Sequence, residues 1–360
     1  MPELQGVGYG QAAAQLRRGM SMPFAAWAGC GIAAFVLAFV ATGLLRRYAL
    51  SRRLLDQPDE RRNHVVPTPR GGGLSIALVV LFGYCVLVWA EPSTAFRWGG
   101  FVLGLAMVAG IGWLDDHRPL SARLRLCVHA LAAGLMSVTA WSIGGGLPEM
   151  TVAFCAAIIL INVWNFMDGI DGLAVTQAMI VSACGLWLAG ATGAAGVLSM
   201  LVLAGCAGFL PWNFPKARIF LGDAGSGALG YSIAGILMAS MAQERGSAMQ
   251  LLLPMAAFLV DAGCTLLSRI LKHEKWWMAH SQHTYQMLAR RCGSHVRVTI
   301  GYAVFSISCM TFTWLLSFSG TKSMLPGVMA VYAFAAMLWW RIRSERLRCP
   351  GKTGRNDTNP

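Results

Sequence analysis

The chain has 360 residues, of which 56% are hydrophobic and only 12% are charged. Soluble domains carry about 25% charged residues, so this composition excludes an ordinary soluble protein and predicts an integral membrane protein. The formal net charge is +13, but the basic residues gather in alternate connections between apolar runs, which argues against a nucleic-acid partner.

Eleven apolar runs have the length of a helix that crosses a bilayer. We place them at 23–45, 71–90, 98–114, 124–141, 148–164, 174–190, 194–211, 225–242, 249–270, 298–318 and 324–341. The predicted fold class is an all-α polytopic membrane protein with about eleven transmembrane helices. Residues 1–22 form a predicted leader, 23–341 a single transmembrane domain, and 342–360 a basic, disordered cytoplasmic tail.

The distribution of positive charge predicts the orientation. Lysines and arginines concentrate in 46–70, 271–297 and 341–355, whereas the opposite connections carry only Arg97, Arg245 and Lys322 beyond the leader. Cytoplasmic loops are enriched in these residues, so the N-terminus is predicted outside and the C-terminus in the cytoplasm.

Acidic residues follow the third, fifth and seventh of these runs. Asp115 and Asp116 directly follow the third run, Asp168 and Asp171 lie in NVWNFMDGIDGLA, and Asp223 lies in FPKARIFLGDAGSG. Carboxylates are costly in a membrane protein and mark function. Because these connections all fall on the predicted cytoplasmic side, they indicate a metal and phosphate site at that surface.

The spacing within the clusters supports this interpretation. Asn162, Asn165 and Asp168 recur every three residues, which places them along one helix face. Asp223 stands between two glycines, where backbone can approach a ligand and a carboxylate suits Mg²⁺. An isolated Asp-Asp pair or Gly-Asp turn is more often a solvated helix end, but three such clusters together favour a site.

Two further loops carry candidate phosphate ligands. His64 and Arg70 precede three glycines in the first cytoplasmic loop, where arginine and backbone N–H groups suit phosphate oxygens. His280 and His283 lie in a late histidine-rich loop, for which we favour phosphate contacts over zinc. Asp261, within the ninth run, is either functional or paired with Arg269 or another polar neighbour.

The order of these motifs, from DQPDERRNH through WLDD, NVWNFMDGIDGLA and NFPKARIFLGDAGSG to the late histidine loop, resembles the polyprenyl-phosphate N-acetylhexosamine-1-phosphate transferases (glycosyltransferase family 4). The resemblance covers roughly residues 45–300. It implies transfer of a sugar 1-phosphate from a UDP-N-acetylhexosamine to undecaprenyl phosphate, with release of UMP. It also implies a Mg²⁺ cofactor, with Mn²⁺ as an alternative, and a multi-pass protein of the bacterial inner membrane whose active site faces the cytoplasm.

The resemblance also assigns roles to residues. Asp223 would be the main Mg²⁺ ligand, while Asp115 and Asp116 would support the metal and orient or deprotonate the lipid phosphate. The predicted nucleotide- and substrate-binding residues are Asn162, Asn165, Asp168, Asp171, Asn213, Phe220, His280, His283, Arg70 and His64, with Phe220 stacked on uracil.

One departure bears on the sugar. Relatives often read His-x-His-His where this chain has His283, Thr284, Tyr285 and Gln286. This version is similar to enzymes that initiate O-antigen with deoxy sugars such as FucNAc or QuiNAc. A homodimer is compatible with the sequence. The alternative function is a polytopic transporter of an anionic solute, although transporters place charges at the membrane midplane.

Overall fold

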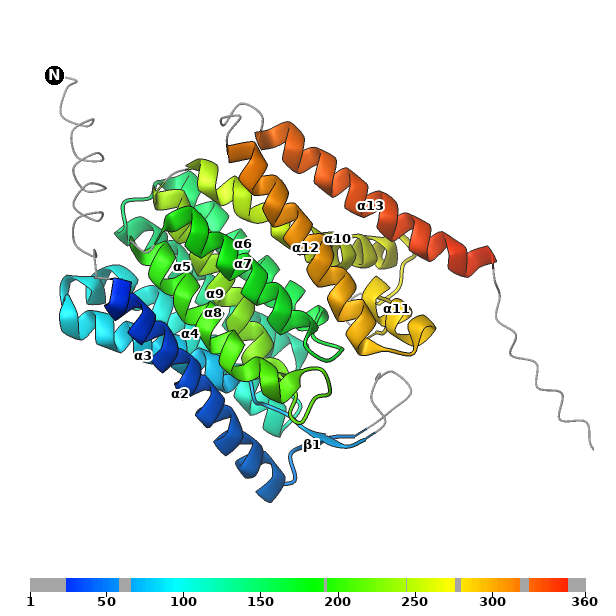
Figure 1. Ribbon diagram of the computed structural model, residues 1–360, viewed down its shortest axis with the longest axis horizontal. Helices are drawn as coiled ribbons and strands as arrows, with labels where there is room; N and C mark the ends of the chain where they lie inside the picture. Colours follow the sequence, from blue (N-terminus) through cyan, green and yellow to red (C-terminus); the bar gives the residue numbers. More distant parts are fainter. Residues whose placement is uncertain are drawn as a thin grey trace, which may run out of the picture.

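The computed structural model describes residues 24–57, 66–190, 193–243, 245–275, 280–317 and 324–348. Each of the eleven predicted apolar runs forms a helix in this part of the chain, and long helices lie side by side in Figure 1. These helices are α2 (Phe24–Ser51), α3 (Leu74–Ala90), α4 (Ser93–His117), α5 (Ala122–Ser142), α6 (Leu147–Phe166), α7 (Leu173–Ala189), α8 (Gly193–Asn213), α9 (Gly222–Gln243), α10 (Arg245–Leu271), α12 (His295–Ser317) and α13 (Met324–Arg348). The all-α polytopic fold is therefore confirmed.

The number of membrane crossings is confirmed only in part. Among the described residues, nine helices are long and apolar enough to cross a bilayer. The helices α3 and α7 are equally apolar but have 17 residues each, at the short end of the spanning range. A total of eleven crossings, and the orientation of the chain, stay predictions.

Three elements were not predicted. The nine-residue helix α11 (Thr284–Cys292) follows the histidines of the late loop. The strands β1 (Leu55–Asp56) and β2 (Thr68–Pro69) pair antiparallel, with Leu55 opposite Pro69. Such short elements lack a long apolar period that the sequence could reveal.

The predicted boundaries of the domain need one correction. The last helix continues to Arg348, so residues 342–348 of the predicted disordered tail are helical. The polar end of a membrane helix can extend past the apolar run because its backbone bonds are internal. The predicted leader and the rest of the tail lie outside the described residues.

The helix α9 is the centre of the bundle. Its spanning segment is 94% buried, against 11% for α13. It packs against α3, α4, α6, α7, α8 and α10. Its glycines, alanines and serines allow this, since small residues let helix backbones approach closely; a Cβ on Gly230 would lie 2.2 Å from the Leu160 carbonyl oxygen of α6.

Successive helices run in alternate directions, which positions the functional residues. The C-terminal ends of α4 and α6 therefore lie at the same end of the bundle as the N-terminal end of α9. The strand β1 and helix α11 lie at that end too, at the bottom and lower right of Figure 1.

Candidate active site

The three acidic clusters meet where α4, α6 and α9 end or begin. The guanidinium of Arg125 joins two of them, since its Nη1 donates to Asp115 Oδ2 at 3.0 Å and to Asp223 Oδ2 at 2.9 Å. Asn165, in the last turn of α6, donates from Nδ2 to Asp223 Oδ1 at 2.9 Å. Asp223 is thus held from two sides, with 32% of its side chain exposed.

Asp116 plays a different part from its neighbour Asp115. Its carboxylate accepts hydrogen bonds from the backbone N–H groups of Asp223 at 3.1 Å and Ala224 at 3.2 Å, and the residue is 3% exposed. These N–H groups belong to the first turn of α9 and have no partner within their helix. Asp116 therefore caps α9 and fixes the backbone that carries Asp223.

The glycine-rich end of the first loop lies alongside the Asp223 loop. Phe220 N–H donates to the Pro69 carbonyl at 2.8 Å, and Gly72 N–H donates to the Phe220 carbonyl at 3.0 Å. Gly222 has φ +75°, and a Cβ there would lie 2.6 Å from Asp116 Oδ2 and 2.7 Å from the Gly71 nitrogen. Only glycine combines this left-handed backbone with so close an approach.

This pairing brings Arg70 to the same end of the bundle. Its Nη1 lies 3.9 Å from Asp56 Oδ1, a long ion pair. Its Nε is buried and has no hydrogen-bond partner among the described residues. Buried donors are costly to leave unpaired, so Arg70 has donor capacity left for an anion.

Asp168 lies in the turn between α6 and α7. No hydrogen bond or ion pair reaches its carboxylate from the described part of the chain. Burial first, and then the negative charges of Asp223 and Asp116, raise the pKa of Asp168 well above its usual value. Either a proton or a cation must offset this concentration of carboxylates.

The rest of this turn is fixed by structural contacts. Asp171 Oδ2 accepts from Ala217 N–H at 3.3 Å and lies 3.4 Å from His295 Nδ1. Asn213 accepts from Gly172 N–H at 2.9 Å, donates to the Ile219 carbonyl at 3.0 Å, and is 4% exposed. Both side chains hold these loops together, and their place in a nucleotide pocket stays a prediction.

The late histidines lie against the end of α6. The His283 ring stacks on Phe166 and Tyr285, with centroids 5.9 Å away in each case, and the His280 ring centroid is 4.8 Å from it. Burial lowers the pKa of His280 to about 4, helped by the nearby His283 and Arg269, and burial also lowers the pKa of His283. His283 is only 3% exposed, whereas His280 is half-buried.

The structure brings together most, but not all, of the predicted site residues. Asp115, Asp116, Asn165, Asp168 and Asp223 converge, with Arg70 and Phe220 on the adjoining loops. Asn162 instead donates to the Ile158 carbonyl of its own helix at 2.8 Å. His64 lies outside the described residues.

Sequence reasoning missed the roles of Arg125, Tyr285 and His295. Arg125 follows the Asp-Asp pair by nine residues and lies among several basic residues. Its position in the first turn of the helix after the Asp-Asp pair was the available signal. The partners of Tyr285 and His295 come from distant helices, and no sequence pattern links them.

The side chains of the site can be compared with the ligands that Mg²⁺ prefers. Among the described residues, no three His, Cys, Asp or Glu side chains are close enough to hold a metal ion by themselves. Mg²⁺ is commonly bound by one or two carboxylates together with waters and substrate phosphates, rather than by an all-protein cage. The partly exposed Asp223, the adjacent Asp115 and the unpartnered Asp168 fit such a shared site.

Fold and site together define a multi-pass membrane protein with a carboxylate-rich site at one end of its helix bundle. Residues 98–241 match the sequence profile of glycosyl transferase family 4. This match contains the clusters at Asp115, Asp168 and Asp223.

The chain is also similar in sequence to three named transferases. The chain is 32% identical to the decaprenyl-phosphate N-acetylglucosaminephosphotransferase of Mycobacterium tuberculosis (strain CDC 1551 / Oshkosh) over 60% of this chain and 61% of the relative. It is 28% identical to the undecaprenyl-phosphate alpha-N-acetylglucosaminyl 1-phosphate transferase of Thermotoga maritima, covering 72% and 80%. It is 30% identical to the phospho-N-acetylmuramoyl-pentapeptide-transferase of Synechococcus elongatus, covering 54% and 59%.

The family match and the names of these relatives support a relationship to the polyprenyl-phosphate N-acetylhexosamine-1-phosphate transferase superfamily. The alignment spans about three fifths of the length of the mycobacterial relative.

Proposed function

We propose that this protein transfers an N-acetylhexosamine 1-phosphate from a UDP-sugar to undecaprenyl phosphate, releasing UMP. The observation that carries the proposal is the convergence of Asp115, Asp223 and Asn165 from three helices around Arg125. Phosphoryl transfer depends on positioning and charge neutralisation, and this arrangement supplies both. The names of the relatives support the same reaction class.

In the proposed reaction, an oxygen of the lipid phosphate attacks the phosphorus that bears the sugar. The bond from that phosphorus to the UMP oxygen breaks, and UMP leaves with the electron pair. Mg²⁺ would neutralise the phosphate charges at Asp223 with support from Asp115, and Mn²⁺ is an alternative ion. Asp116 would act indirectly, by holding the first turn of α9.

The UDP-sugar is proposed to lie between the Asp168 turn and the glycines of the first loop. Arg70 has an unpaired buried Nε for a phosphate oxygen, and His280 is the more accessible of the two histidines. The proposed deoxy sugar, FucNAc or QuiNAc, rests on the resemblance alone. Tyr285, where the chain departs from relatives, is 1% exposed and donates to the Phe166 carbonyl, so it faces protein and not a sugar.

The proposed setting is the cytoplasmic face of a bacterial inner membrane, where the transfer would initiate O-antigen or a related surface polysaccharide. The charge distribution supports this side, because the site shares its end of the bundle with the basic loops. Asp261, the main acidic residue within a predicted span, does not support the transporter alternative. Four hydrogen-bond donors of the protein already occupy its carboxylate.

The test is UMP release by purified protein given undecaprenyl phosphate, Mg²⁺ and, separately, UDP-linked GlcNAc, GalNAc, FucNAc and QuiNAc. Lipid-dependent release with one donor, lost in Asp223→Asn, is the expected result. Release that is independent of the lipid, or equal in Asp223→Asn, would contradict the proposal. Omission of Mg²⁺, with Mn²⁺ added back, tests the cofactor.

A further inference from the structure

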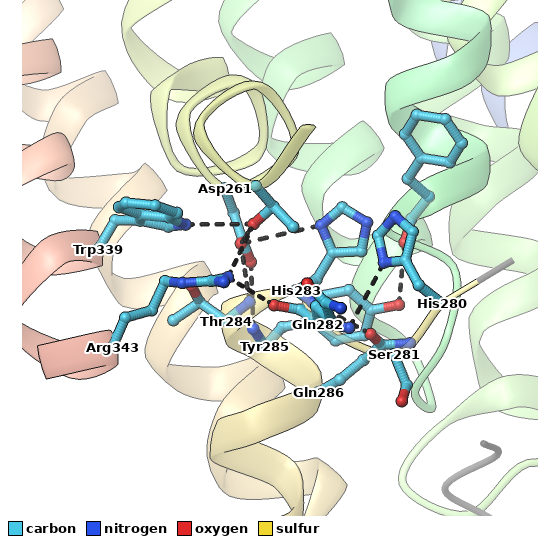
Figure 2. Close-up of polar contacts among 12 residues, drawn as sticks. Asp261, His280, Ser281, Gln282, His283, Thr284, Tyr285, Gln286, Trp339 and Arg343 are labelled. Atoms are coloured by element: carbon cyan, nitrogen blue, oxygen red, sulfur yellow. Dashed lines mark hydrogen bonds and ion pairs between the residues drawn. The ribbon is translucent and has the colours of Figure 1, made fainter. Parts of the chain in front are cut away.

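Asp261 lies in α10, within the spanning part of the bundle, and has no contact with the acidic cluster described above. It is 2% exposed. Its Oδ1 accepts from the N–H of Thr284 at 2.8 Å, and its Oδ2 accepts from the N–H of Tyr285 at 3.1 Å. These are the first two residues of α11, so a carboxylate from one helix caps the N-terminus of another, where negative charge is favourable. Figure 2 shows Asp261 facing this turn.

Two more hydroxyl groups donate to the Asp261 carboxylate. Tyr302 of α12 donates its hydroxyl to Oδ2 at 2.8 Å, and Thr265 donates to Oδ1 at 3.3 Å. With four donors on two buried oxygens, Asp261 has little capacity left for a ligand. The sequence left a pairing with Arg269 open, but Arg269 instead pairs with Glu274 at 2.8 Å.

The capped helix carries the histidine loop to the acidic turn. Tyr285 donates its hydroxyl to the Phe166 carbonyl, at the end of α6, at 3.0 Å. A Cβ on Gly169, the residue after Asp168, would lie 2.2 Å from that hydroxyl oxygen. The position of α11 therefore decides how His280 and His283 lie relative to Asp168.

The helix α13 holds the same segment from the other side. Arg343 donates from Nη1 to the Gln282 carbonyl at 2.7 Å, and its guanidinium lies over the Trp339 ring, 4.8 Å from the centroid. Trp339 donates from Nε1 to Thr265 Oγ1 at 3.2 Å. Thr265 in turn donates to Asp261, so α13 and Asp261 belong to one hydrogen-bonded network around residues 282–285 (Figure 2).

We infer that Asp261 and Arg343 are positioning residues, which fix the His280–Gln286 segment against the Asp168 turn. Through this segment, the outermost helix α13 is coupled to binding of the UDP-sugar. The inference rests on the proposed function for the identity of the substrate, a UDP-sugar. The anchoring itself does not, because it concerns hydrogen bonds within the chain.

The first readout is amide hydrogen exchange of residues 280–292 in full-length protein in detergent. Arg343→Ala should accelerate exchange there by at least tenfold, while exchange in α9 stays unchanged. Trp339→Phe removes one donor and keeps the ring, so a smaller acceleration is expected. The matched control is Trp340→Phe on the same helix, where the side chain is 69% exposed. Arg297→Ala controls for the loss of one exposed positive charge at this end of the bundle.

The second readout is the kinetics of UMP release. Arg343→Ala should raise the KM for the UDP-sugar about tenfold and lower kcat less than threefold, and Arg343→Lys should recover part of the KM. Asp261→Asn should show the same pattern more strongly if it folds. Unchanged exchange at 280–292 in Arg343→Ala, or faster exchange with an unchanged KM, would overturn the inference. Absence of UMP release from the wild type would instead refute the proposed function, and hydrogen exchange would still decide the anchoring.

Discussion

Asp116 accepts hydrogen bonds from the backbone N–H groups of Asp223 and of the residue after it, so one acidic residue builds the helix start that presents the other. The two carboxylates thereby have separate tasks. Asp116 is buried and structural, while Asp223 keeps an exposed edge. Asp116 therefore supports the site through the backbone of α9.

Asp116→Ala should lower the stability of the protein. It leaves two N–H groups of α9 without an acceptor, which costs about 1–3 kcal/mol for buried groups. Thermal unfolding in detergent would measure this. Asp223→Asn is the matched variant, because it keeps the backbone donors and should lose turnover with an unchanged melting temperature. Equal melting temperatures for Asp116→Ala and Asp223→Asn would contradict the capping role.

Arg125→Ala should impair turnover more than stability. Without the guanidinium, Asp115 and Asp223 repel, and loss of a residue that orients such ligands typically costs about 10- to 100-fold in metal affinity or activity. Arg125→Lys should be intermediate, since an ammonium keeps the charge but not the planar fork. Steady-state UMP release is the measurement. Arg123→Ala, two residues away and exposed, should be close to wild type; similar losses in both would remove the special role of Arg125.

Gly73→Ala should destabilise the site because two backbones cross there. A Cβ on Gly73 would lie 2.4 Å from Gly225 Cα and 2.8 Å from the Leu221 carbonyl oxygen. Overpacking of this kind costs about 1–3 kcal/mol, which a melting curve would register. Gly110→Ala is the control, since a Cβ at Gly110 has no neighbour within 4 Å. A Gly73→Ala protein as stable as Gly110→Ala would show that the crossing can widen freely.

We expect His280 and His283 to lower the stability of the protein in mild acid. Burial holds the pKa of His280 at about 4 and lowers the pKa of His283, although Asp261 opposes the shift at His283. The unfolded chain, with histidine pKa values near about 6.5, binds more protons below that pH. The contribution of these histidines to stability is therefore full above about pH 6.5 and falls as the pH approaches about 4.

Melting temperatures at pH 7 and pH 5 test this dependence. His283→Gln should reduce the difference between the two values. His273→Asn should not, since His273 is exposed and asparagine tolerates its positive φ of 53°. A His283→Gln protein whose melting temperature changes between the two pH values as much as that of the wild type would refute the prediction.

Some features followed from the sequence by itself. Hydrophobicity is a local property, so the apolar runs gave the helices, and the alternation of direction placed Asp115, Asp168 and Asp223 at one end of the bundle. The motifs and their order also predicted the similarity to glycosyl transferase family 4, whose sequence profile residues 98–241 match. The polar loop that contains α11 had no such period, and its helix was not predicted.

Only the tertiary structure decided which side chains meet. The sequence treats Asp115 and Asp116 alike, yet one is bridged by Arg125 and the other caps α9. Likewise, the sequence left the partner of Asp261 open, and the structure places the start of α11 against its carboxylate. Such contacts depend on the rotation and separation of helices that are distant in the chain, which packing sets and local pattern does not record.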